Sequence, residues 1–168
     1  MTGVTGLDCS VLKGKRMINL DSEEDGVMWV SCAGGVRADV VLDVEYTETC
    51  GNCFEISVSG LHGGHSGAEI HNGYANANKV LGRILASLQN KADFALCNIS
   101  GGAMDNAITR DSKCIVASDA DICSIISGIS CEIVGDYKKA DPDMKITALS
   151  CDKAEKSMTD DSTKVVIG

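Results

Sequence analysis

The chain has 168 residues, of which 44% are hydrophobic and 23% are charged, an ordinary balance for a soluble globular protein. A chain of this length can form one core, or one domain together with a fragment of another. The net charge of −9 argues against nucleic acid or an anionic membrane surface as a partner. No apolar run approaches the roughly 20 residues that span a bilayer, and no signal peptide opens the sequence, so we expect a cytoplasmic protein.

Residues 1–37 differ in pattern from the rest of the chain. We expect a short helix over 2–13 and two buried strands over 16–20 and 27–32. The first strand runs into an acidic stretch that begins at Asp21. A strand that ends in an acidic loop can place a carboxylate at a metal ion, but acidic turns are more often simply solvated.

Residues 38–168 read as one α+β unit. The expected strands cover 40–48, 53–59, 93–99, 107–117 and 144–151, and the expected helices cover 75–88 and 121–134. Ser118-Asp119 is a candidate cap for the second helix, and Asp160 is a candidate start of a further one. Leaving out the first strand, the order is βαββαβ, which predicts a ferredoxin-like sandwich with both helices on one face of the sheet.

Nine cysteines are spread through the sequence, and their odd number fits reduced thiols acting as small core residues. Cys50 and Cys53 form the one pair with Cys-x-x-Cys spacing. A zinc ribbon needs a second such pair, and a thioredoxin-like motif needs a following helix. Because Gly51-Asn52 separates two predicted strands, the favoured interpretation is a hairpin turn.

The most distinctive stretch is 59–79, a glycine-rich loop between a predicted strand and a predicted helix. It holds His62, His65 and His71. The three histidines form a zinc site, or they are solvated, or His65 donates a hydrogen bond to a substrate or transition state. Their spacing is not a standard zinc-ligand pattern. A second glycine-rich segment, 100–110, reads on its residues alone as a turn between antiparallel strands.

Both segments resemble parts of a known family. GLHGGHSGAEIHNGYANANKVLGRIL, residues 60–85, resembles the lid domain of aminoacyl-histidine dipeptidases, which are two-zinc metallopeptidases. SGGAMDNAITR, residues 100–110, resembles a Gly-Gly-x-x-x-Asn-Ala-Ile-Pro-Arg segment of the same lid. GKRMINLDSEEDG, residues 14–26, resembles a segment of the catalytic domain.

The resemblance implies a division of the chain. Residues 1–37 would be a fragment of an α/β catalytic domain, in which Asp21 ligates one of two zinc ions. Residues 38–168 would be the lid, or dimerisation, domain, truncated at its C-terminus. The family's Asp-Glu-Glu motif would lie just before Met1, so we expect Met1 to be internal to a larger enzyme and this chain to be inactive alone.

The resemblance also implies roles for individual residues. His65 would stabilise the tetrahedral oxyanion of a dipeptide substrate, Arg110 would hold a substrate carboxylate and Asn106 would orient the substrate amide. Thr109 stands where the family has proline, and we expect a looser turn there. His62 and His71 receive no catalytic role and are interpreted as structural or solvated. Dimers joined through the lids are expected, and the alternative to the enzyme is a non-enzymatic ferredoxin-like module that dimerises or binds a small molecule.

Overall fold

The computed structural model describes residues 6–16, 18, 25–31, 36 and 38–168, and the chain divides into two units, Met1–Val40 and Val41–Gly168. In the first unit, one 3-10 turn, η1 (Cys9–Val11), takes the place of the helix expected over 2–13, as far as residues 6–16 show. Asp8 caps this turn, since its carboxylate accepts a hydrogen bond from the Ser10 N–H at 2.9 Å.

Of the two strands expected in the first unit, the structure tests only one. The one predicted over 27–32 is wrong, because 27–31 are described and form no strand. A strand needs a hydrogen-bonded neighbour to be stable in water, and these residues have none among the described parts of the chain. The strand predicted over 16–20 lies largely outside the described residues.

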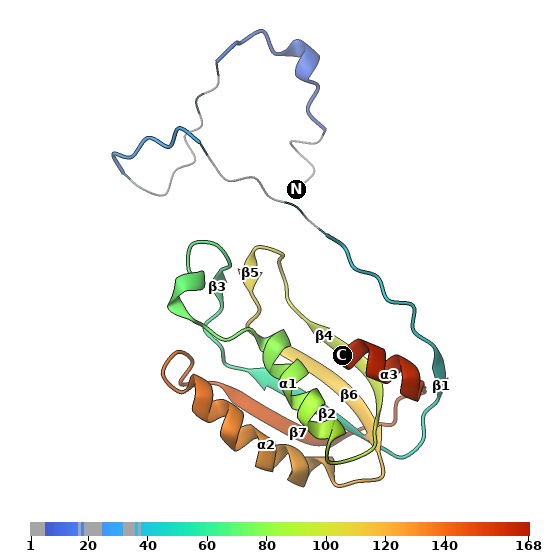
Figure 1. Ribbon diagram of the computed structural model, residues 1–168. Helices are drawn as coiled ribbons and strands as arrows, with labels where there is room; N and C mark the ends of the chain where they lie inside the picture. The colour runs from blue at the N-terminus through green and yellow to red at the C-terminus, as the bar shows by residue number, and fades with distance from the viewer. Residues whose placement is uncertain (1–5, 17, 19–24, 32–35, 37) are drawn as a thin grey trace. The chain divides into compact units, whose positions relative to one another are not determined.

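The second unit contains a four-stranded antiparallel sheet with helices α1 (Ala77–Gln89) and α2 (Ile122–Tyr137) on one face (Figure 1). Its strands are β2 (Asn52–Ser59), β4 (Ala95–Gly101), β6 (Ser112–Ser118) and β7 (Lys145–Cys151). The strand order is β4-β6-β2-β7. This order, with a helix after β2 and another after β6, confirms the predicted ferredoxin-like arrangement.

The core lies between the sheet and the two helices. Alternate residues of β2 face it, namely Phe54, Ile56 and Val58, as the period-two pattern predicts. The helices contribute stripes at helical spacing: Val80, Leu81, Ile84, Leu85 and Leu88 from α1, and Ile122, Ile126, Ile129 and Ile133 from α2. Burying each such side chain contributes about 1.5–3 kcal/mol, so this layer fixes the scaffold.

Polar side chains set where the helices begin. The Asn76 side chain accepts hydrogen bonds from the N–H groups of Asn78 and Lys79 and so caps α1. Asp121 caps α2 by accepting from Ser124, so the cap predicted at Ser118-Asp119 is placed too early. Ser118 and Asp119 precede the helix instead, because β6 extends through Ser118.

Three segments differ from the sequence-based expectations because their partners are distant in the chain. The strand expected over 107–117 is interrupted, giving β5 (Ala107–Ile108) and β6. The strand expected over 40–48 shrinks to β1 (Tyr46–Glu48), which pairs with β8 (Lys156–Met158). Since β1 does not pair with β2, Cys50–Cys53 is no hairpin turn.

Helix α3 (Asp160–Ile167) follows β8, which confirms the helix predicted to start at Asp160. Thr159 caps it by accepting a hydrogen bond from the Ser162 N–H at 3.3 Å. Among the described residues, none of the helices is both long and apolar enough to cross a membrane.

Candidate functional site

A short ladder joins the two glycine-rich segments. Strand β3 (Gly64–His65) pairs with β5, so that His65 lies opposite Ala107. The Ser66 N–H extends the pairing by donating to the Asn106 carbonyl at 2.9 Å. Residues 40 or more positions apart in the sequence are thereby brought to one place, and two of the three predicted lid residues, His65 and Asn106, become neighbours.

The imidazole of His65 is held by its own loop. Its Nδ1 accepts hydrogen bonds from the N–H groups of Gly67, at 3.0 Å, and Ala68, at 3.1 Å. A ring nitrogen that accepts two N–H bonds carries no proton, so the neutral ring is protonated on Nε2. His65 is exposed, and its Nε2–H has no hydrogen-bond partner among the described residues. The site therefore presents a hydrogen-bond donor of fixed tautomer.

Glu69 closes the turn that carries His65. Its carboxylate accepts a hydrogen bond from the His65 N–H at 2.8 Å, and its own N–H donates to the His65 carbonyl at 3.0 Å. Gly64 has φ of +125°, and a Cβ there would lie 2.7 Å from a Glu69 carboxylate oxygen. Glycine is required at Gly64 both by the backbone conformation and by the closeness of Glu69.

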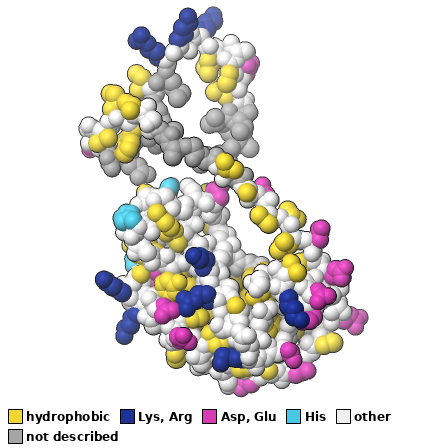
Figure 2. Space-filling view, in the orientation of Figure 1, with side chains coloured by type: hydrophobic (Ala, Val, Ile, Leu, Met, Phe, Trp, Pro, Cys, Tyr) yellow, Lys and Arg dark blue, Asp and Glu magenta, His cyan; other side chains and the backbone are white. Residues whose placement is uncertain are grey.

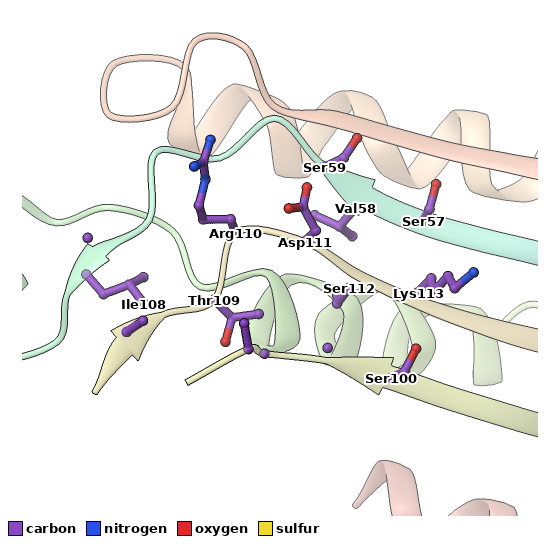
Figure 3. A pocket seen from close by; sticks show the side chains of 15 residues that line it. Ser57, Val58, Ser59, Ser100, Ile108, Thr109, Arg110, Asp111, Ser112 and Lys113 are labelled. Carbon is purple, nitrogen blue, oxygen red and sulfur yellow. The ribbon is translucent and has the colours of Figure 1, made fainter. Parts of the chain in front are cut away.

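Arg110 lies against the same loop. Its Nε donates to the Leu61 carbonyl at 3.2 Å, and a Cβ at Gly63 would collide with the Arg110 side chain. Figure 3 shows this side chain extending from the connection between β5 and β6. The terminal guanidinium nitrogens have no hydrogen-bond partner among the described residues, which leaves them available to an anionic ligand.

The turn at Thr109 is not loose, contrary to expectation. Thr109 is buried, and its carbonyl accepts a hydrogen bond from the Ala77 N–H at 2.9 Å. Its hydroxyl lies 3.5 Å from the side-chain nitrogen of Asn78. These contacts tie the turn to the start of α1. The carbonyl bond is one that a proline would also make, and the hydroxyl contact is what threonine adds.

A cavity of about 590 Å³ lies beside this cluster, within the range of small-molecule sites (Figure 3). Its lining comes from the end of β2, the end of β4 with the turn after it, and the β5–β6 connection: Ser57–Ser59, Gly64, Ser100–Ala103 and Ala107–Lys113. Arg110 is part of this lining. The cavity and the exposed donors thus share one end of the sheet.

The other two histidines are placed differently. The His62 ring stacks on Tyr74 with centroids 4.8 Å apart and planes 7° from parallel. His71 is exposed in the 3-10 turn η2 (Ile70–Asn72). Figure 2 shows histidine side chains at the surface of the second unit. Asn106 is also exposed, and its side-chain amide makes no hydrogen bond within the described part of the chain.

Sequence reasoning missed two acidic residues of the site, Glu69 and Asp141. The four-residue spacing between His65 and Glu69 was a usable local signal for a turn. Asp141 accepts hydrogen bonds from His62 and Ala75, and nothing in the sequence links residues that are 66 or more positions apart.

No metal centre forms within the described residues, since no three His, Cys, Asp or Glu side chains gather where they would hold an ion. The three histidines of the loop therefore do not make a zinc site together. Asp21, which the family resemblance implies to be a zinc ligand, lies outside the described residues.

Comparisons with known proteins agree with this geometry. Residues 56–120, which hold the second half of β2, the His65 loop, α1, β4, β5 and β6, match the family described as Peptidase dimerisation domain. This part of the second unit is therefore similar to a peptidase dimerisation domain.

Two of the similar proteins are named as dipeptidases. The chain is 38% identical over 131 residues to the cytosol non-specific dipeptidase of Escherichia coli strain K12, an alignment that covers 77% of this chain and 27% of the relative. The crystal structure of the aminoacylhistidine dipeptidase from Vibrio alginolyticus superposes with a TM-score of 0.65 at 24% identity, covering 73% of this chain and 27% of that one. The chain is thus homologous to a part of a dipeptidase and spans about a quarter of its relatives' length.

Proposed function

We propose that this chain is the lid-bearing part of a zinc dipeptidase that hydrolyses Xaa-His dipeptides, with His65 stabilising the oxyanion formed during attack on the peptide carbonyl. The observation that carries the proposal is the fixed tautomer of His65, whose Nδ1 accepts from Gly67 and Ala68. Its Nε2–H is the donor that a developing oxyanion requires. A donor already oriented before the reaction needs no reorganisation during it.

Arg110 and Asn106 complete the proposed substrate contacts. The free terminal nitrogens of Arg110 suit a bidentate interaction with the carboxylate of a dipeptide, and its bond to Leu61 holds the side chain in place. The side chain of Asn106 lies one residue from the partner of His65 in the β3–β5 ladder. There it is available to orient the substrate amide.

The remaining chemistry belongs to parts of an enzyme outside the described residues. In the proposed enzyme, Asp21 would hold one of two zinc ions, whose chemistry when bound would be to activate water for attack on the peptide carbonyl. The dimerisation-domain match supports a homodimer joined through the lid. The name of the Escherichia coli relative supports a cytoplasmic location.

The test is to express the whole enzyme to which the chain is proposed to belong and to assay a dipeptide panel with and without a chelator. We expect hydrolysis that favours a C-terminal histidine, is lost on chelation and returns with zinc. The 168-residue chain alone, given zinc and the same peptides, should show none. Failure of the whole enzyme to cleave any dipeptide would favour the non-enzymatic module, and turnover by the repurified chain would contradict the fragment proposal.

A further inference from the structure

One buried carboxylate bridges the two stems of the loop that carries His65. Asp141, in the turn between α2 and β7, is 1% exposed. One of its carboxylate oxygens accepts from the His62 N–H at 2.7 Å, and the other accepts from the Ala75 N–H at 2.7 Å. His62 and Ala75 lie on either side of His65, so a single side chain holds the entry and the exit of the loop.

A carboxylate in this position is costly unless its oxygens are satisfied. Hydrogen bonds from backbone N–H groups to an ionised acceptor are short and roughly twice as strong as neutral ones, and both of the Asp141 bonds have the short length. Two N–H groups thus donate to the two carboxylate oxygens. These hydrogen bonds offset the cost of burying the carboxylate only while both ends of the loop, at His62 and Ala75, stay in place.

The ring of His62 is not what holds Asp141. Its Nδ1 lies 4.0 Å from the nearer carboxylate oxygen, beyond hydrogen-bonding distance, and the His62 side chain is 58% exposed. At that separation the ring makes no hydrogen bond to the buried carboxylate. The bridge thus runs through backbone N–H groups, and it survives any change of the His62 side chain that leaves the backbone in place.

The turn that carries Asp141 is itself firmly placed. The Asp141 N–H donates to the Tyr137 carbonyl at 2.8 Å, at the end of α2, and the Met144 N–H donates to the Asp141 carbonyl at 3.2 Å. Gly60 has φ of +78°, and a Cβ there would collide with the Asp143 carbonyl. The loop stem and this turn therefore pack backbone against backbone, with α2 as the fixed support.

We propose that Asp141 is a positioning residue for His65: by bridging His62 and Ala75 it fixes the span of the loop, and so keeps the Gly67 and Ala68 N–H groups on Nδ1. It touches neither substrate nor reacting atoms. Its effect on the state of the His65 ring is independent of any enzymatic role, whereas its effect on turnover rests on the function proposed above.

The test in the 168-residue chain uses Asp141→Asn, with Asp136→Asn as the matched control. An amide offers one acceptor oxygen and turns its NH2 toward the other N–H, so one stem is released with little change of shape. Asp136, on α2, makes an exposed ion pair with Arg83. The readouts are the ring nitrogen shifts of His65 by NMR and the hydrogen exchange of the Gly67 and Ala68 amides.

In the wild-type chain and in Asp136→Asn we expect the single Nε2–H tautomer and slow exchange of both amides. In Asp141→Asn we expect a mixture of tautomers and amide exchange faster by about tenfold or more, while the amides paired between β2 and β6 stay protected. An unchanged His65 tautomer in a folded Asp141→Asn chain would overturn the proposal. Exchange that rises equally in the sheet would overturn it too, because it would mark Asp141 as a general stabiliser.

If Asp141→Asn does not fold, the wild-type chain supplies the test. The amides of His62, Ala75, Gly67 and Ala68 should then open with one common free energy, because one bridge holds them. Openings of clearly different free energy would contradict the proposal.

In the whole enzyme, Asp141→Asn should lower kcat on the order of 100-fold with little change of KM, the size expected when a catalytic group is misplaced by about 1 Å. Unchanged kcat alongside a disturbed His65 ring would refute the function proposed for His65 and leave the loop bridge standing. Unchanged kcat with an undisturbed ring would refute the bridge itself.

Discussion

The two units of the chain use similar apolar residues in opposite ways. In Val41–Gly168 most of the buried large apolar side chains pack into one core, in which Leu81 is 1% exposed and Ile84 is fully buried. In Met1–Val40 the described ones face solvent, with Met28 at 87% and Val30 at 91%. An apolar pattern predicts burial only where a partner surface exists. The contrast supports the proposal that residues 1–37 belong to a catalytic domain.

The largest expected effect is on stability. Leu81→Ala should lower the free energy of unfolding by about 2–5 kcal/mol, because it removes packed methyl groups and leaves a cavity. Leu12→Ala in the first unit should change it by less than about 0.5 kcal/mol, since Leu12 is 59% exposed. Chemical denaturation of both variants measures the difference. A Leu12→Ala cost close to that of Leu81→Ala would show that the first unit has a core of its own.

A smaller effect should come from pH. Burial raises the pKa of the Cys114 thiol to about 12 and that of Cys97 to about 11, above the pKa of the same thiols in the unfolded chain. Between the unfolded and the folded pKa of these thiols, the folded state binds more protons than the unfolded state. The stability that this contributes is therefore fully present below about pH 8.5 and falls as the pH rises toward 11. Replacing both cysteines by alanine should flatten this fall relative to wild type. An equally steep fall in the double variant would assign it to other groups.

The smallest effect is expected at Trp29, the one tryptophan of the sequence, which is 68% exposed. Its fluorescence maximum should already be that of a hydrated indole in the folded chain and should barely shift in denaturant. A strongly blue-shifted maximum that moves on unfolding would show that Trp29 is buried. That result would contradict the solvent exposure of the apolar side chains described in the first unit.

Much of the fold was predictable because its signals are local. The alternation in β2 and the helical spacing of Val80, Leu81 and Ile84 each report on a few adjacent residues, and both elements formed as predicted. The β1–β8 pairing was not predictable in this way, since Tyr46 lies opposite Met158. Pairings of that separation depend on the whole topology rather than on any one segment.

The candidate site shows the same difference between local signals, which the sequence reveals, and long-range contacts, which it does not. The glycine-rich sequence around His65 marked a loop that presents a histidine, and the family resemblance singled out Asn106 and Arg110. The ladder that joins the two segments pairs only two residues on each side, too few to leave a periodic pattern. The hydrogen bond from Arg110 to Leu61 and the bridge made by Asp141 likewise depend on contacts that appear only in the folded chain.

The most direct test of the account compares three histidine variants of the whole enzyme at equal metal content. His65→Ala should lower kcat on the order of 100- to 1000-fold, with a smaller effect on KM, because the lost Nε2–H acts mainly in the transition state. His62→Ala and His71→Ala should cost much less, since the His62 ring packs on Tyr74 and His71 is exposed. A loss in either of them as large as in His65→Ala would contradict the assignment of His65 as the oxyanion donor.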